Sequence, residues 1–234
     1  MKKEFNTIKR DGKIYLLGYT GPEKEVIIPS NIDGLPVFIV ADYRNQYPNA
    51  ETIVIERGVE SIGERSFYGC EKLKKVTLPD TIIKIDNLAF GYCLDLECVE
   101  LNEGVIEIGD AAFAGCSDLK SINLPTSLCS IGSLAFSSTQ LQEITIPPKI
   151  KKIKNGTFML CKELISCKAE QIEVISSSAF EGTESLKSIY LPNAKAVFER
   201  AFSSSKIEKV YLPENIEYIS PEAFNSSKAN IYYT

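Results

Sequence analysis

The chain has 234 residues, of which 44% are hydrophobic and 24% are charged, a composition typical of a soluble folded protein. Its 26 basic and 31 acidic residues give a net charge of −5 without a basic stripe, which argues against nucleic acid or an anionic membrane as a partner. No apolar run approaches the roughly 18 to 20 residues that cross a bilayer, and the start of the chain lacks the apolar core of a secretory signal. We therefore expect no membrane insertion, and either an intracellular location or a sequence taken from a longer chain.

The chain contains seven cysteines and no histidine. An odd number of cysteines without CxxC spacing argues against a disulfide framework, and the usual zinc sites would lack their imidazole ligands. The missing histidine also excludes nucleophiles that are activated by a Ser-His-Asp or Cys-His arrangement. We expect no metal, no cofactor and no enzymatic activity.

Residues 1–25 are predicted to form an N-terminal cap in front of a repeated region. Apolar residues alternate on both sides of Asp11-Gly12, a dipeptide that is typical of a β-hairpin turn. A cap is expected because the first coil of a solenoid would otherwise expose its stacking face. The first coil, residues 26–50, is atypical because it carries an insertion at 31–36 and because Asn45 stands where later coils have phenylalanine.

From residue 51 to residue 230 the sequence repeats every 21 to 23 residues, and residues 231–234 begin a further strand. Such a period is typical of a solenoid, in which stacked coils bury a core that one coil could not bury alone. Each coil opens with a short strand that has two inward apolar residues, and proline often ends the strand. The predicted pairs are Ile53/Ile55, Val76/Leu78, Val99/Leu101, Ile122/Leu124, Ile144/Ile146, Cys167/Ala169, Ile189/Leu191 and Val210/Leu212.

The second half of each coil carries further columns of similar residues. Two apolar residues lie three positions apart, and Gly63, Gly109 and Gly132 follow three of these pairs, where we expect a tight bend. A phenylalanine comes next, and the alanine that usually precedes it favours a short helical turn. The phenylalanines are Phe67, Phe90, Phe113, Phe136, Phe158, Phe180, Phe202 and Phe224.

The pattern LxxVxLPxxxxxIxxxAFxxCxxL resembles the BspA-like bacterial leucine-rich repeat proteins, in the subclass with an IGxxAFxGCxxL signature. The resemblance covers about residues 26–233, and the opening GYTGPEKEVIIPSNIDGLPV is similar to the family's usual entry into the array. It implies a mainly β, right-handed leucine-rich-repeat solenoid with a parallel concave sheet, built as a single elongated domain. It also implies an extracellular or cell-surface location, with adhesion or host-protein binding as the role.

Cysteine recurs three residues after the phenylalanine, at Cys70, Cys93, Cys116 and Cys161. Neighbouring coils are about 4.8 Å apart, so a ladder of metal ligands or disulfides has to be considered. Thr139, Thr183, Ser205 and Ser227 replace cysteine in the other coils, which favours packing as small buried side chains instead. Carboxylates at the bends, such as Glu64, Asp86, Asp110 and Glu222, could form the pair that a glycosidase needs, but the sequence singles out no pair.

The residue between the two inward positions of each strand must point outward onto the sheet face. Tyr190, Tyr211 and Tyr232 form a ladder of such residues, and we expect their rings to present one continuous face with Lys168 one coil earlier. The ladder also agrees with the high strand propensity of tyrosine alone. The complete outward column is Ile27, Val54, Thr77, Glu100, Asn123, Thr145, Lys168, Tyr190, Tyr211 and Tyr232.

These observations predict a non-enzymatic binding scaffold that recognises a protein or glycan through its sheet face. The candidate ligand-binding residues are Lys168, Tyr190, Tyr211, Tyr232, Glu100 and Asn123. The alternatives are a structural spacer in a larger surface protein and, more distantly, a solenoid hydrolase. The strand edge at residues 231–234 is a candidate for self-association, because unpaired strand edges recruit partners.

Overall fold

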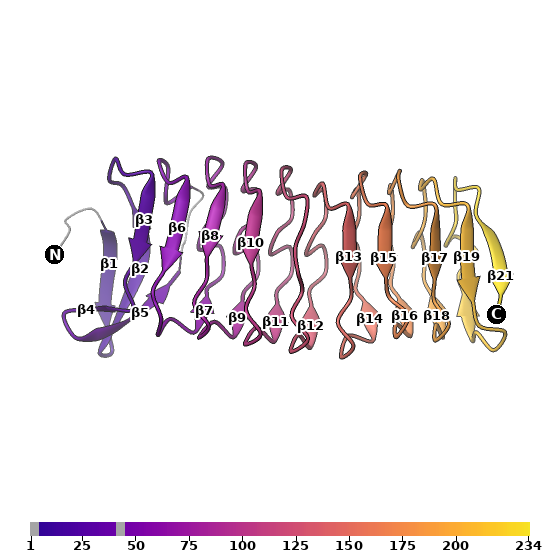
Figure 1. The fold of residues 1–234 in the computed structure, drawn as a ribbon, viewed down its shortest axis with the longest axis horizontal. Helices are drawn as coiled ribbons and strands as arrows, with labels where there is room; N and C mark the ends of the chain where they lie inside the picture. The colour runs from indigo at the N-terminus through magenta and orange to yellow at the C-terminus, as the bar shows by residue number, and fades with distance from the viewer. Residues whose placement is uncertain (1–4, 41–44) are drawn as a thin grey trace.

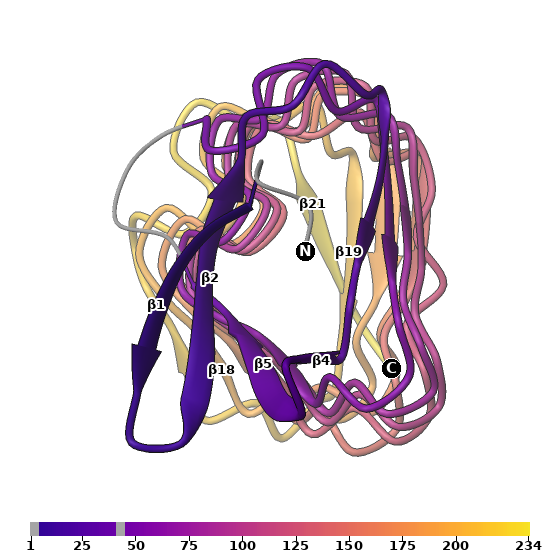
Figure 2. The ribbon, with the colours of Figure 1, turned by 90° about the vertical axis from the view of Figure 1, so that its left-hand side faces the viewer.

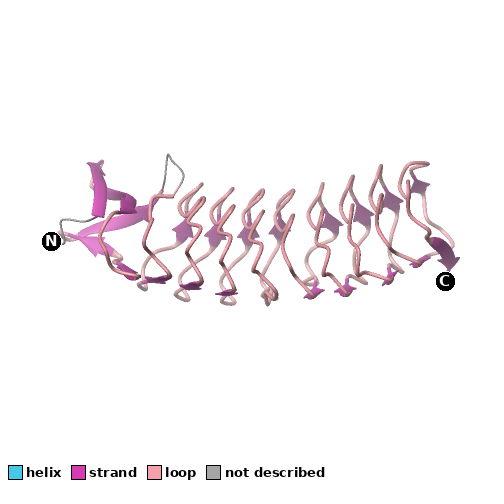
Figure 3. Ribbon diagram, turned by 90° about the horizontal axis from the view of Figure 1, so that it is seen from above, coloured by secondary structure: helices cyan, strands magenta, loops and turns pink. Residues whose placement is uncertain are grey.

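The computed structural model describes residues 5–40 and 45–234, so the expectations for residues 1–4 of the cap and 41–44 of the first coil lie outside the described residues. The described residues form a row of coils that follow one another along the long axis of the molecule (Figure 1). Strands and turns make up these coils, and the described part of the chain contains no helix (Figure 3). The mainly β solenoid with parallel sheets is thus confirmed, whereas the short helical turns expected at the Ala-Phe positions are not found there.

The first strand of each coil belongs to what we call the long-strand ladder. In all of these strands except the last, residues 230–233, the inward apolar residues are buried, and the residue between them is exposed or half-buried, as predicted. All neighbours in this ladder are parallel. The strands are β3 (Glu25–Ile28), β6 (Thr52–Ile55), β8 (Lys75–Thr77), β10 (Cys98–Glu100), β13 (Glu143–Thr145), β15 (Ser166–Lys168), β17 (Ser188–Tyr190), β19 (Lys209–Leu212) and β21 (Asn230–Tyr233).

The long-strand ladder is not continuous. Its strands pair in three groups, which are β3-β6-β8-β10, β13-β15 and β17-β19-β21. Ile122 and Leu124, which the repeat predicts as a strand pair, lie in a segment that forms no strand, although Ile122 remains buried. The inward and outward alternation of side chains therefore persists where the backbone pairing does not.

The second half of each coil has two apolar residues three positions apart, and the second of them lies in a short strand. These strands form what we call the short-strand ladder, on a different side of the coil from the long-strand ladder (Figure 2). This ladder is also parallel, and it is interrupted between β12 and β14. Its strands are β5 (Leu35–Ile39), β7 (Ser61–Ile62), β9 (Lys84–Ile85), β11 (Glu107–Ile108), β12 (Ser130–Ile131), β14 (Lys152–Ile153), β16 (Val174–Ile175), β18 (Ala196–Val197) and β20 (Tyr218–Ile219).

The predicted N-terminal hairpin consists of β1 (Phe5–Arg10) and β2 (Lys13–Tyr19). Asp11 and Gly12 both have positive φ, 51° and 69°, as a two-residue hairpin turn requires. Because β2 pairs in parallel with β5, the hairpin extends the short-strand ladder. The small strand β4 (Asn31–Ile32), in the predicted insertion, folds back on β5. Among the described residues no strand pairs with the outer edge of β3, so the hairpin does not cover the long-strand ladder.

The Ala-Phe turns are not helical because their backbone hydrogen bonds alternate between two directions. The Phe90 N–H donates to the carbonyl of Ala112 in the next coil at 2.8 Å, whereas the Cys93 N–H donates to Phe90 within its own coil at 3.2 Å. The backbone angle φ is positive two residues before Phe90, at Leu88 (55°), and two residues after it, at Tyr92 (59°). A residue in the left-handed region interrupts a right-handed helix, so the turn closes without one.

The phenylalanine column is the axis of the core, as predicted. Seven consecutive ring pairs, from Phe67–Phe90 to Phe202–Phe224, have centroids between 5.2 and 5.8 Å apart and interplanar angles of 2° to 19°. The placement of Asn45 in this column was wrong. The Asn45 N–H donates to the Tyr68 carbonyl in the next coil at 2.7 Å, and φ of Asn45 is 56°. Residues two places after a phenylalanine, such as Tyr92, have the same hydrogen bond and the same positive φ, so Asn45 belongs to their column. Tyr47 instead packs on Phe67, at 5.0 Å.

The chain turns after Gly63, Gly109 and Gly132, as predicted, but close packing between coils and not backbone conformation explains why these residues are glycine. None of them has positive φ. A Cβ at Gly132 would overlap the carbonyl group of Gly109 in the preceding coil, and a Cβ at Gly63 would overlap the Ile39 carbonyl oxygen. Glycine at this position therefore lets two coil backbones approach each other.

Replacing Phe113 with alanine should destabilise the fold by about 3 to 5 kcal/mol, because it removes a fully buried ring from between two others. Urea unfolding, followed by circular dichroism, measures this change. Lys120→Ala on the exposed surface is the control and should cost under about 0.5 kcal/mol. Equal unfolding midpoints for the two variants would contradict the assignment of the core axis.

Gly132→Ala should destabilise the protein by about 1 to 3 kcal/mol, because the added methyl group meets backbone that has no free rotation. Gly12→Ala, at a positive-φ turn position with open space around it, is the matched comparison and should cost about 1 kcal/mol from backbone strain alone. Thermal unfolding of both variants tests the order, and a larger loss for Gly12→Ala would refute the close-packing explanation.

Candidate ligand-binding face

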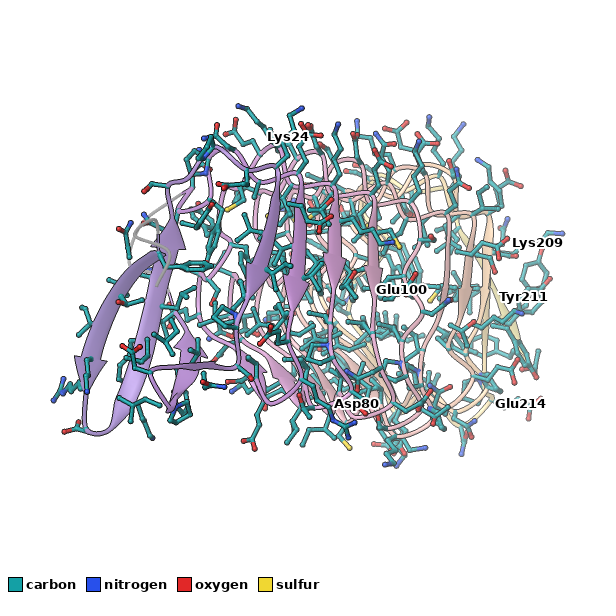
Figure 4. The ribbon with its side chains drawn as sticks, turned by 60° about the vertical axis from the view of Figure 1, so that its left-hand side comes forward. Lys24, Asp80, Glu100, Lys209, Tyr211 and Glu214 are labelled. Carbon is teal, nitrogen blue, oxygen red and sulfur yellow. The ribbon has the colours of Figure 1, made fainter. Side chains whose placement is uncertain are left out.

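The outward positions of the long-strand ladder make a continuous register on the surface where the strands are paired. Thr52, Lys75 and Cys98 align in one row, and Val54, Thr77 and Glu100 align in the next. The side chains of residues i and i+2 share this face because successive residues of a strand point to opposite sides. Figure 4 shows Glu100 on this face, with Lys209 and Tyr211 projecting outward from β19 nearer the C-terminus.

The three predicted tyrosines do lie on neighbouring strands. Tyr190 aligns with Tyr211, and Tyr211 aligns with Tyr232. The rings of Tyr211 and Tyr232 are stacked, with centroids 5.2 Å apart and 26° between planes, whereas Tyr190 meets Tyr211 edge-on at 6.2 Å and 64°. Tyr190 and Tyr232 are 47% and 42% exposed, values that leave much of each ring open to a ligand. The rings of Tyr211 and Tyr232 are therefore stacked on each other, whereas the Tyr190 ring is turned relative to them.

The other predicted site residues are exposed but separated from the tyrosines. Lys168 ends β15, and β15 is not paired with β17, so a break in the ladder lies between Lys168 and Tyr190. Glu100 lies on the N-terminal group of strands. Asn123 lies in the segment without a strand, beside a hollow of about 190 Å³ that residues 122–124 and 143–145 line. The structure thus brings together only Tyr190, Tyr211 and Tyr232.

Sequence reasoning missed the companion row of this face. Ser188, Lys209 and Asn230 align with one another, two residues before the three tyrosines. The spacing of two residues in the sequence could have identified this row, because alternate residues of a strand share a face. We call Ser188, Tyr190, Lys209, Tyr211, Asn230 and Tyr232 the tyrosine face. It combines aromatic area with hydroxyl, amide and ammonium groups that donate hydrogen bonds.

The cysteine column is buried and hydrogen-bonded. The Sγ atoms of Cys93, Cys116 and Cys161 donate to the phenylalanine carbonyl of an earlier coil at 3.0 to 3.1 Å. Where the column has threonine or serine, the hydroxyl donates to the phenylalanine carbonyl of its own coil, as Thr183 does to Phe180 at 2.9 Å. Cysteine, threonine and serine therefore exchange because each is a small buried donor. Burial raises the pKa of the Cys116 thiol to about 12 and that of Cys161 to about 11.

Two of the bend carboxylates accept hydrogen bonds from backbone N–H groups. An oxygen of Asp86 accepts from the Asn87 N–H at 2.9 Å, and one of Asp110 accepts from Ser133 at 2.7 Å. A hydrogen bond from Lys195 lowers the pKa of Glu173, and one from Arg200 lowers that of Glu181. Among the described residues no three His, Cys, Asp or Glu side chains gather closely enough to hold a metal ion. Nor does that part of the chain contain a helix that could cross a membrane.

Comparisons with known proteins agree with the repeat architecture. The family model described as BspA type leucine rich repeat region matches residues 39–165 and 163–233, in six copies. The structure is similar to that of the T. pallidum leucine-rich repeat protein, with 28% identity, a TM-score of 0.67, and coverage of 76% of this chain and 83% of that one. A leucine-rich repeat protein from Eubacterium ventriosum shares the fold, with 18% identity, a TM-score of 0.51, and coverage of 100% of this chain and 71% of that one. A comparison with curated proteins gave no match.

The packing explanation of the cysteines predicts their reactivity. At about pH 8 only the exposed Cys129 and, more slowly, the half-buried Cys98 should react with a thiol reagent in the folded protein, since buried thiols stay protonated. In denaturant without reductant, all seven thiols should react. Two or more missing thiols, or stoichiometric zinc by elemental analysis, would show that the column forms disulfides or binds metal.

Proposed function

Because the chain belongs to the BspA-type leucine-rich repeat family, we propose that it is a non-enzymatic scaffold that binds a protein or glycan ligand through its tyrosine face. The structural relative with the highest similarity reported above is likewise a leucine-rich repeat protein. Family membership also supports adhesion at a cell surface as the setting for this binding. The tyrosine face is assigned from the side chains of this chain and not from those of its relatives.

The observation that carries the proposal is the alignment of three tyrosines on neighbouring, hydrogen-bonded strands. The strand register fixes the spacing of the rings, so little side-chain freedom is lost when a ligand binds. Aromatic side chains supply a large part of the energy at binding surfaces, and tyrosine adds a hydroxyl that reaches water at the rim. Lys209, beside Tyr211, adds a charged donor. An extended ligand would lie across β17, β19 and β21.

A hydrolase is less well supported. A glycosidase needs one carboxyl group whose pKa is raised, so that it can donate a proton. Glu173 and Glu181 have the opposite environment, since hydrogen bonds from Lys195 and Arg200 lower the pKa of these two carboxyl groups. A glycan or matrix-protein array distinguishes the binding scaffold from a structural spacer. The scaffold should show saturable binding on the array, and the spacer should bind nothing.

Tyr211→Ala should weaken binding to the ligand found on such an array by about 2 kcal/mol or more, because Tyr211 is the central ring of the three. Isothermal titration calorimetry measures the change. The thermal unfolding midpoint should stay close to that of the parent, since this ring lies outside the core.

The control is Thr77→Ala, which lies on the same ladder in the N-terminal group of strands and should bind normally. If Tyr211→Ala bound the ligand as tightly as the parent does, the tyrosines would reflect strand propensity alone and the binding face would lie elsewhere.

A further inference from the structure

The short-strand ladder opens between β12 and β14. At other coil junctions the backbone bonds across this ladder are made, as from Gly132 N–H to the Ile108 carbonyl at 2.8 Å and from Ser176 to Ile153 at 3.0 Å. The equivalent donors here are the N–H groups of Lys151 and Lys154, and the equivalent acceptors are the carbonyls of Cys129 and Ile131. Among the described residues these groups form no such bonds with each other.

The opening is a hollow of about 230 Å³ that is lined by four lysines of one coil. Lys149, Lys151 and Lys152 are exposed, and Lys154 is half-buried. Two of them make polar contacts inside the protein: Lys154 Nζ donates to Ser130 Oγ at 3.1 Å, and Lys149 Nζ donates to the Ser127 carbonyl at 3.5 Å. We call this site the lysine hollow.

No carboxylate lines the lysine hollow, and none of its four lysines forms an ion pair within the described part of the chain. The acidic side chain on the next coil, Glu173, is bound by Lys195 at 2.7 Å, although Lys151 also helps to lower its pKa. Four ammonium groups around one space repel one another, so an anion placed among them would gain their combined attraction. The net charge of −5 conceals this local concentration of positive charge.

We propose that the lysine hollow binds the sulfate ester groups of a linear sulfated polysaccharide. The two walls of the hollow offer complementary chemistry. The wall formed by residues 149–154 presents ammonium and N–H donors, which sulfate oxygens accept. The opposite wall presents the Ser130 hydroxyl and the carbonyls of Cys129 and Ile131, which sugar hydroxyls can donate to. A sulfated sugar supplies both kinds of group.

Other polyanions fit these walls less well. The hollow has no aromatic lining on which a nucleic acid base could stack. A flat anionic membrane would also meet carboxylates on both sides of the site. Glu107 aligns with Ser130 from the coil before the hollow and pairs with Lys84 at 3.3 Å, and Glu173 lies on the coil after the hollow. A narrow chain laid along the hollow between these two coils avoids both carboxylates. The site is on the opposite ladder from the tyrosine face, so it is independent of the function proposed above.

The probe is a heparin hexasaccharide, with the chemically desulfated hexasaccharide as its reference, titrated into the folded chain at low ionic strength. The parent should bind the sulfated form and lose that binding at about 0.5 M salt, where charges are screened beyond a few ångströms. Lys151→Gln with Lys152→Gln should weaken binding about tenfold or more, because two charge-assisted contacts are removed.

The matched control is Lys72→Gln with Lys120→Gln, which removes the same charge from exposed lysines outside the hollow and should bind like the parent. Tyr211→Ala should also bind like the parent, which separates this site from the tyrosine face. Thermal unfolding midpoints confirm that each variant is folded.

Three results would overturn the proposal. The first is equal binding of the sulfated and desulfated hexasaccharides, or none of either. The second is equal weakening by the two lysine double variants, which would indicate attraction by overall charge. The third is tighter binding to a single-stranded oligonucleotide or to phosphatidylserine vesicles at the same ionic strength, which would assign the hollow to a nucleic acid or a membrane.

Discussion

The stack of phenylalanine rings sets the spacing on which the rest of this solenoid depends. Around each ring the backbone bonds alternately to its own coil and to the next coil, as Phe90 and Cys93 do, so the turn both closes one coil and fixes its distance from the next. The two ladders inherit that distance. Because a single ring would be exposed at the end of one isolated coil, each coil depends on its neighbours for burial, and stability grows along the row.

The conformation of this turn explains several residue choices that otherwise look like surface hydrophobicity. Positive φ recurs two residues after the phenylalanine, where Gly115 and Gly182 are favoured and Tyr92 and Leu160 are tolerated. The large residues lie over the glycines of the next coil: a Cβ at Gly115 would meet the Tyr92 ring at 2.9 Å, and one at Gly182 would meet Leu160 at 2.7 Å. Tyr92 and Leu160 are 45% and 40% exposed, yet they pack coil against coil. They are therefore poor candidates for a ligand face.

The sequence was sufficient for the repeat, the hairpin at Asp11-Gly12 and the core columns, because each depends on periodic burial or on one local turn. It could not show the conformation of the Ala-Phe turn, since alanine before phenylalanine favours a helix locally and the bonds to neighbouring coils decide otherwise. It also placed Lys168 next to Tyr190, because side-chain alternation continues across β15 and β17 while the backbone pairing stops. The net charge did not reveal the lysine hollow, because a sum over the whole chain does not show where the charged residues lie.

The interruptions of the ladders matter because a regular solenoid leaves little backbone available for recognition. Where strands pair, N–H and carbonyl groups are used between coils, and only side chains can bind a ligand. Between the coils at 122–131 and 144–153 neither ladder is paired. The phenylalanine turn still holds these coils together, with Phe136 N–H bonded to Thr157 at 3.0 Å, although the Phe136–Phe158 distance of 5.8 Å is the longest in the stack. The core therefore stays closed at this junction while backbone donors and acceptors become accessible on both sides, and it is beside one of these openings that four lysines converge.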